Sequence, residues 1–72
     1  MDLKETMAIN LRRIRHERQM TQEELADLSG ISARYVGAIE RADKSASVTV
    51  LGKISDALGI EPGDLLLATR KG

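Results

Sequence analysis

Apolar residues recur at helical spacing along most of the chain, and this pattern predicts an all-α protein. The first apolar stripe repeats every three or four residues, as one face of an α-helix does, and continues to about Glu17. Its members are Leu3, Met7, Leu11 and Ile14. A later stripe has the same spacing, with Ser47 or Thr49 placed to cap its start and Gly59 to end it. Its members are Val50, Leu51, Ile54 and Leu58.

Between these stripes, residues 22–41 contain two short amphipathic segments separated by Gly30. Thr21 and Glu24 have the Thr-x-x-Glu spacing of a capping box, so a helix is predicted to begin directly after Thr21. Gly30 supplies the left-handed conformation in which helices commonly end, and Ser32 caps the helix that follows. Two short helices joined by such a turn form a helix-turn-helix unit.

The second helix of this unit is predicted to have a nearly bare outer face. Val36 and Ile39 are three residues apart and face inward, which leaves the opposite stripe for solvent or a ligand. This stripe consists of Ala33, Arg34, Gly37, Ala38 and Arg41. A glycine there costs about 1 kcal/mol of helix propensity, which indicates that something approaches closely. Insertion into the DNA major groove, with Arg34 pairing to guanine, is favoured over packing against another helix.

A final short helix is predicted after Pro62, because proline suits the first turn of a helix. Leu65, Leu66 and Leu67 follow it. Successive residues on a helix point about 100° apart, so three consecutive leucines cannot all face one core. A chain of 72 residues also buries only a modest core. We therefore expect this helix, through Leu66 and Leu67, to contribute to a symmetric dimer interface.

The helix-turn-helix unit resembles that of the Cro and phage-repressor (Xre-type, lambda-repressor-like) family of DNA-binding domains. In this family the unit starts with Gln, has Ala fifth and Gly ninth, and has apolar residues at four further positions. The matching residues are Gln22, Leu25, Ala26, Gly30, Ile31, Val36 and Ile39. The resemblance extends back to Leu11, Ile14 and Arg15 and forward through Leu58, Gly59 and Ile60. Where the family often has Gly and Pro in the following loop, this chain has Ala42 and Ser47.

The resemblance implies an all-α, compact five-helix lambda-repressor-like domain over residues 1–72, with the helix-turn-helix unit at 22–41 and a short tail at 68–72. It also implies a transcriptional regulator that binds double-stranded DNA sequence-specifically, as a homodimer on a palindromic operator. The alternatives are a protein-interaction module, or an antitoxin or controller partner that uses the same fold. A net charge of zero supports these alternatives, since DNA-binding domains are often strongly basic.

The expected DNA contacts are assigned position by position. Base contacts are expected from Ala33, Arg34, Gly37 and Ala38, with Arg34 as the specificity residue. Gln22 resembles the family residue that binds a backbone phosphate at a helix start. Further phosphate contacts are expected from Ser32, Tyr35, Arg41, Lys44 and Ser45. For Tyr35 the alternative is covering the edge of the next helix; for the others it is a helix cap or a solvated loop residue.

Two further pairs of residues have expected roles. The family often pairs an Arg of the first helix with a Glu of the recognition helix, which implies a structural ion pair between Arg15 and Glu40. Glu23 and Asp27 are four residues apart on one exposed helix face and resemble a patch through which some phage-type repressors contact RNA polymerase. Ordinary solvated acids, favoured near a helix start by the helix dipole, are the alternative for this patch.

Composition excludes several other kinds of site. The chain has no cysteine and one histidine, so neither a disulfide framework nor a zinc site is expected. No acid–base pair, phosphate-binding glycine loop or metal cluster indicates an enzyme, a cofactor or a small-molecule ligand. The absence of a long apolar run and of a secretory leader predicts a soluble cytoplasmic protein with no membrane span. Basic charge brackets the proposed recognition helix: residues 1–20 have five basic and three acidic side chains, and residues 31–46 have three basic and two acidic ones.

Overall fold

The structure, a computed structural model, describes residues 2–68. This part of the chain is entirely helical and contains no β-strand. It folds into four α-helices and one 3-10 helix: α1 (Leu3–Glu17), α2 (Gln22–Ser29), α3 (Ala33–Glu40), α4 (Val48–Leu58) and η1 (Pro62–Leu65). None of the helices in the described range is long and apolar enough to cross a membrane.

The prediction of a final α-helix after Pro62 is wrong, because this segment is a single 3-10 turn that ends at Leu65. Asn10 of α1 explains where it stops: its Nδ2 donates to the carbonyl oxygens of Leu65 at 2.9 Å and of Leu67 at 2.8 Å. These carbonyls are thereby used in tertiary contacts and not in a continuing helix. Leu65 is fully buried, Leu66 is half-buried and Leu67 is 65% exposed. Most of the predicted tail at 68–72 lies outside the described residues.

The predicted helix ends are confirmed by their capping contacts. The Thr21 hydroxyl accepts from the Glu24 backbone N–H at 3.0 Å, and the Glu24 carboxylate accepts from the Thr21 N–H at 2.8 Å. Gly30 ends α2 in the left-handed conformation with φ of 74°. At the start of α4 the cap is Ser47, whose hydroxyl accepts from the Val50 backbone N–H at 3.1 Å. Each of these caps satisfies backbone groups that the helix itself leaves unpaired.

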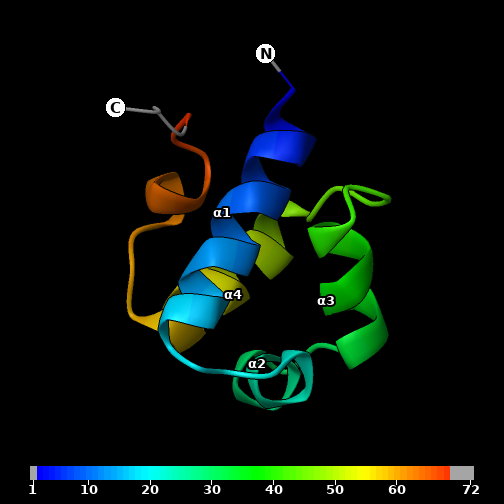
Figure 1. The fold of residues 1–72 in the computed structure, drawn as a ribbon, viewed down its shortest axis with the longest axis vertical. Coiled ribbons are helices and arrows are strands. Elements are labelled where there is room, and N and C mark those ends of the chain that lie inside the picture. The colour runs from blue at the N-terminus through cyan, green and yellow to red at the C-terminus, as the bar shows by residue number, and fades with distance from the viewer. Residues whose placement is uncertain (1, 69–72) are drawn as a thin grey trace.

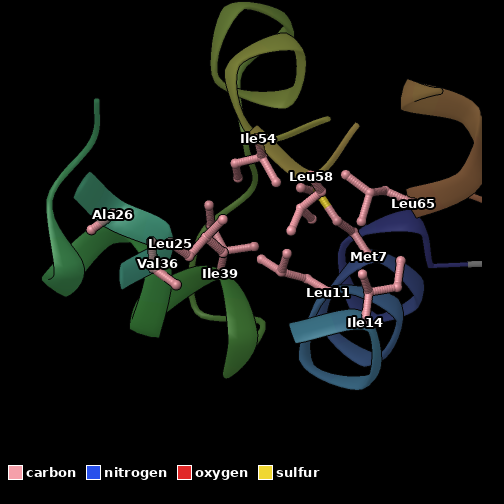
Figure 2. Close-up of a cluster of buried hydrophobic side chains, with 10 residues drawn as sticks. All are labelled: Met7, Leu11, Ile14, Leu25, Ala26, Val36, Ile39, Ile54, Leu58 and Leu65. Carbon is pink, nitrogen blue, oxygen red and sulfur yellow. The ribbon is translucent and has the colours of Figure 1, made fainter. Parts of the chain in front are cut away.

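The apolar stripes of all five elements meet in one core (Figure 2). α1 packs on α3 and η1, while α2 packs on α3 and α4. The buried apolar side chains of the cluster are Met7, Leu11, Ile14, Leu25, Ala26, Val36, Ile39, Ile54, Leu58 and Leu65. In Figure 1, α3 lies on one side of α1 and η1 on the other, with α2 at the end opposite the start of α1. The outer side of α3 and the segment around η1 therefore face different directions.

Ala42, in the loop after α3, adopts a left-handed backbone conformation with φ of 60°. A non-glycine residue there costs roughly 1–2 kcal/mol, part of which is offset because alanine restricts the unfolded chain more than glycine does. Ala42→Gly is therefore expected to raise the free energy of unfolding by about 1 kcal/mol in urea titrations. The control Ala57→Gly, inside α4, should lower it by about 1 kcal/mol. If Ala42→Gly does not raise the free energy of unfolding, the loop does not hold Ala42 in this conformation.

Candidate nucleic-acid interface

The first turn of α3 leaves Arg34 exposed to solvent. Ser32 begins the helix, with its hydroxyl accepting a hydrogen bond from the Tyr35 backbone N–H at 3.0 Å. Val36 and Ile39 are 0% and 1% exposed, and both belong to the central core. Because rotating α3 about its axis would expose these two side chains, the core holds Arg34 on the outer side.

A hollow of about 520 Å³ lies between this turn of α3 and the loop over residues 41–47. Tyr35 joins its two sides, since its hydroxyl donates to the Ser45 carbonyl oxygen at 3.3 Å. The six residues that line the hollow are Ser32, Arg34, Tyr35, Ala38, Lys44 and Ser45. The fold thus brings together six of the residues that were expected to contact DNA, from two segments of the chain.

The middle of α3 is less open than its sequence predicts. Gly37 and Ala38 were expected on a bare outer stripe, but both are buried, and Ala38 is only 7% exposed. The Ala38 carbonyl oxygen accepts hydrogen bonds from the backbone N–H groups of Asp43 at 2.9 Å and Lys44 at 3.4 Å, so the loop folds back over it. Gly37 lies beneath two polar side chains, one from α2 and one from the end of α3. The expected exposure is wrong at these two positions because other parts of the fold cover them.

Behind this surface, a buried ion pair connects α1 to α3. Arg15 is 8% exposed and Glu40 is 3% exposed. Arg15 donates from Nε to Glu40 Oε2 at 2.6 Å and from Nη2 to Oε1 at 2.9 Å. Its Nη1 also donates to the Met20 carbonyl oxygen at 2.8 Å. Gln22 Nε2 donates to the same Glu40 Oε1 at 3.0 Å, so the pair also holds the start of α2.

This network keeps the Glu40 carboxylate ionised. Burial alone would raise the pKa of Glu40, but the hydrogen bonds from Arg15 and Gln22, together with the charge of Arg15, lower it below its ordinary value. The hydrogen bond to Glu40 raises the pKa of Arg15, against the opposing effect of burial. Both members of the pair are therefore charged at neutral pH.

The lowered pKa of Glu40 predicts a pH-dependent contribution to stability. Because the folded-state pKa lies below the ordinary value of 4.5, this contribution is complete above pH 4.5 and is lost as the pH falls through the folded-state value. The difference in free energy of unfolding between the wild type and Glu40→Gln should accordingly be constant from pH 7 to about pH 5. It should shrink at lower pH in urea titrations. A difference that grows on acidification would contradict the assigned direction of the pKa shift.

Comparison with known proteins assigns this fold to a family. A family model described as Helix-turn-helix, HTH_3, matches residues 11–65. The chain belongs to this helix-turn-helix family.

Several named proteins and solved structures are similar to this chain. The control protein C.SmaI of Serratia marcescens is 36% identical over 72 residues, which cover 100% of this chain and 83% of that protein. The restriction-modification controller protein C.AhdI from Aeromonas hydrophila superposes with a TM-score of 0.83 at 37% identity, covering 86% of this chain and 94% of that one. The hypothetical transcription factor NHTF from Neisseria gives a TM-score of 0.88 at 36% identity, with coverages of 93% and 77%. The chain thus resembles helix-turn-helix proteins that are named as restriction-modification controllers and as a transcription factor.

The other predicted site residues of this HTH_3 protein lie outside the hollow. Arg41 is exposed and forms a surface ion pair with Asp43, with a distance of 3.0 Å between Nε and Oδ2. Glu23 and Asp27 are both exposed on α2. Their exposure is compatible with a partner contact and equally with ordinary solvated acids, so the role of this patch stays a prediction.

Arg12 in α1 and Arg18, the C-cap residue directly after it, have structural roles that the sequence did not predict. Arg12 Nη1 donates to the Glu40 carbonyl oxygen at 3.3 Å, and Arg18 Nη1 donates to the Leu58 carbonyl oxygen. They thereby satisfy carbonyl groups at the C-terminal ends of α3 and α4, which the helices cannot pair internally. The partners are 28 and 40 residues apart in sequence, so no local pattern identifies them.

Proposed function

We propose that this protein is a transcriptional regulator that binds double-stranded DNA sequence-specifically as a homodimer, with the N-terminal turn of α3 in the major groove. The observation that carries the proposal is the position of Arg34, which is exposed on a helix whose rotation the core fixes. An arginine projecting from such a turn can donate two hydrogen bonds to the N7 and O6 atoms of guanine. Ala33, beside it, is half-buried and adds little bulk at the groove floor.

The polar residues around the hollow would contact the DNA backbone. Ser32 and Ser45 offer hydroxyl groups, and Lys44 offers an exposed cation from the loop after α3. Tyr35 holds that loop against α3 by donating its hydroxyl hydrogen to the Ser45 carbonyl oxygen, and on DNA it would exchange this hydrogen bond for one to a phosphate. Arg41 adds a second exposed cation at the end of the helix. Such contacts fix the position and orientation of the protein on the duplex and leave the reading of sequence to Arg34 and its neighbours.

Selection of bound duplexes from a random DNA pool tests the proposed function. We expect a two-fold symmetric motif, because two copies related by a dyad place their recognition helices on two half-sites about one helical turn apart. The affinity for the selected duplex should fall as salt rises, since phosphate contacts release counterions. If no motif emerges even at low salt, DNA recognition is contradicted and a protein-interaction role for the same fold is favoured.

The proposed homodimer uses the segment around η1, where Leu67 is 65% exposed beside the half-buried Leu66. Asn10 fixes the backbone of this segment, so the apolar side chains are held in place. Leu67→Glu is expected to weaken dimerisation by at least tenfold in sedimentation equilibrium, because a buried leucine contributes roughly 1.5–3 kcal/mol. The matched control is Leu28→Glu, which changes a leucine that is 61% exposed on α2. Equal effects of the two changes, or a monomeric wild type at high concentration, would contradict this interface.

A further inference from the structure

Asp43 is the one acidic side chain that is exposed in the described segment over residues 32–47. The other acid of this segment, Glu40, is buried in the ion pair with α1. Asp43 lies in the chain between Arg41 and Lys44, the two exposed cations proposed to contact phosphates. Because DNA is a polyanion, a surface shaped only for tight DNA binding would not place a carboxylate there.

The backbone fixes where this carboxylate lies. The Asp43 N–H donates to the Ala38 carbonyl oxygen at 2.9 Å, and the left-handed Ala42 turns the chain just before it. Asp43 is thereby held at the C-terminal end of α3. An acidic group is unfavourable at such an end, because the helix carbonyl groups give it a partial negative charge.

The stability of the fold does not explain Asp43 either. Its carboxylate Oδ2 accepts a hydrogen bond from Arg41 Nε at 3.0 Å. The side chains of this pair are 63% and 62% exposed, and an ion pair so open to water contributes little to folding. The effect of Asp43 is therefore sought in what Arg41 does.

Arg41 reaches back along α3 toward the side that carries Arg34. A Cβ atom at Gly37 would lie 3.1 Å from Arg41 Nη1, so the guanidinium lies over Gly37. Positions 34, 37 and 41 share one face of the helix, because they are separated by three and four residues. Arg41 thus presents its guanidinium on the face proposed to meet DNA, with Asp43 bonded to its Nε.

We propose that Asp43 limits the affinity for DNA by competing with a backbone phosphate for the charge of Arg41. In the free protein the carboxylate pairs with the guanidinium and offsets its charge. A phosphate that binds Arg41 must either replace this carboxylate or share the cation with it, and both weaken the contact. The inference rests on the proposed DNA binding and assigns a residue that sets its strength.

The test compares the wild type with Asp43→Asn, which keeps the shape of the side chain and removes its charge. Fluorescence anisotropy measures binding to the selected duplex and to an unrelated duplex of the same length. The affinity of the homodimer should rise about 3- to 10-fold, because each subunit no longer gives up an exposed ion pair. The rise should be the same for both duplexes, since phosphate contacts carry no sequence information, and it should shrink as salt screens the charges.

Asp56→Asn is the matched control. Asp56 is exposed on α4, outside the hollow and the loop after α3, and its substitution changes the net charge by the same amount. It should raise the affinity by less than about twofold. An equal rise in the two variants would show that net charge sets the affinity, and would overturn the role of Asp43. Urea unfolding of each variant confirms that folded proteins are compared.

Arg41→Ala tests whether Asp43 acts through Arg41. In this background Asp43→Asn should raise the affinity at least about twofold less than it does in the wild type, because no guanidinium remains to be shared. The same rise in both backgrounds would mean that Asp43 repels the phosphates directly, which contradicts competition for Arg41. If Asp43→Asn instead binds more weakly than the wild type, the carboxylate orients Arg41 for the phosphate, and the inference is wrong.

Failure of this inference can be told apart from failure of the proposed function. If the wild type selects a motif and Asp43→Asn leaves the affinity unchanged, DNA recognition stands and Asp43 has no part in it. If neither protein binds any duplex at low salt, the proposed DNA recognition fails, and the role of Asp43 fails with it.

Discussion

Replacing Glu40 with Ala is expected to lower the free energy of unfolding by about 3 kcal/mol. The substitution leaves Arg15 as a cation that is 8% exposed, without the carboxylate that accepts two of its hydrogen bonds. It also removes the acceptor for Gln22, so α1, α2 and α3 lose a shared contact. Breaking a buried pair from one side is costly because the remaining charge stays away from water without a partner.

Urea titrations of Arg15→Ala, Glu40→Ala and the double variant measure this effect. The double variant should lose clearly less than the sum of the two single losses, because the second substitution removes a charge that the first left unpaired. Arg13→Ala is the matched control: Arg13 pairs with Glu17 at 3.5 Å on the surface, with side chains 47% and 63% exposed. Arg13→Ala should lower the free energy of unfolding by less than about 0.5 kcal/mol. Additive losses at Arg15 and Glu40 would show that the two side chains do not interact.

Replacing Arg34 with Ala is expected to weaken binding of the homodimer to the selected duplex by about 30-fold or more, because each subunit loses its guanine contact, and to remove a guanine preference from each half-site. The reason is that a bidentate arginine–guanine contact discriminates against the wrong base by roughly 1–3 kcal/mol. The exposed position of Arg34 makes a loss of folding stability small, so the change would report on recognition alone. Fluorescence anisotropy at fixed salt, with the selected duplex and a duplex changed at that guanine, measures both effects.

Lys44→Ala provides the contrast for Arg34. Lys44 is exposed in the loop that lines the same hollow, and a phosphate contact there carries no sequence information. Its loss should weaken binding to both duplexes equally and reduce the salt slope by about 2, since each subunit of the homodimer loses one phosphate contact. If Arg34→Ala behaved in this same uniform way, Arg34 would be a phosphate contact and the assignment of specificity to it would be wrong.

The helices and their ends were predictable from local sequence, since they depend on residues three or four positions apart. The spacing of Leu3, Met7 and Leu11 is enough to define a helical face. The capping box at Thr21 and Glu24 and the left-handed Gly30 are likewise set by neighbouring atoms. For this reason the start of α2, the turn and the start of α3 all have the predicted positions. The exposed Arg34 follows from the same periodicity.

Tertiary contacts decided the surface of α3, the last helix and the arrangement of the polar network. The side chains of Gln22 from α2 and of Arg41 from the end of α3 lie over Gly37, and the backbone of the next loop is bonded to the Ala38 carbonyl oxygen. The last predicted α-helix is a 3-10 turn because Asn10, 55 residues earlier than Leu65, takes up its carbonyl oxygen. The contact of Gln22 with Glu40 joins residues 18 positions apart. Such contacts exist only after the core has brought distant segments together, so helical spacing alone does not predict them.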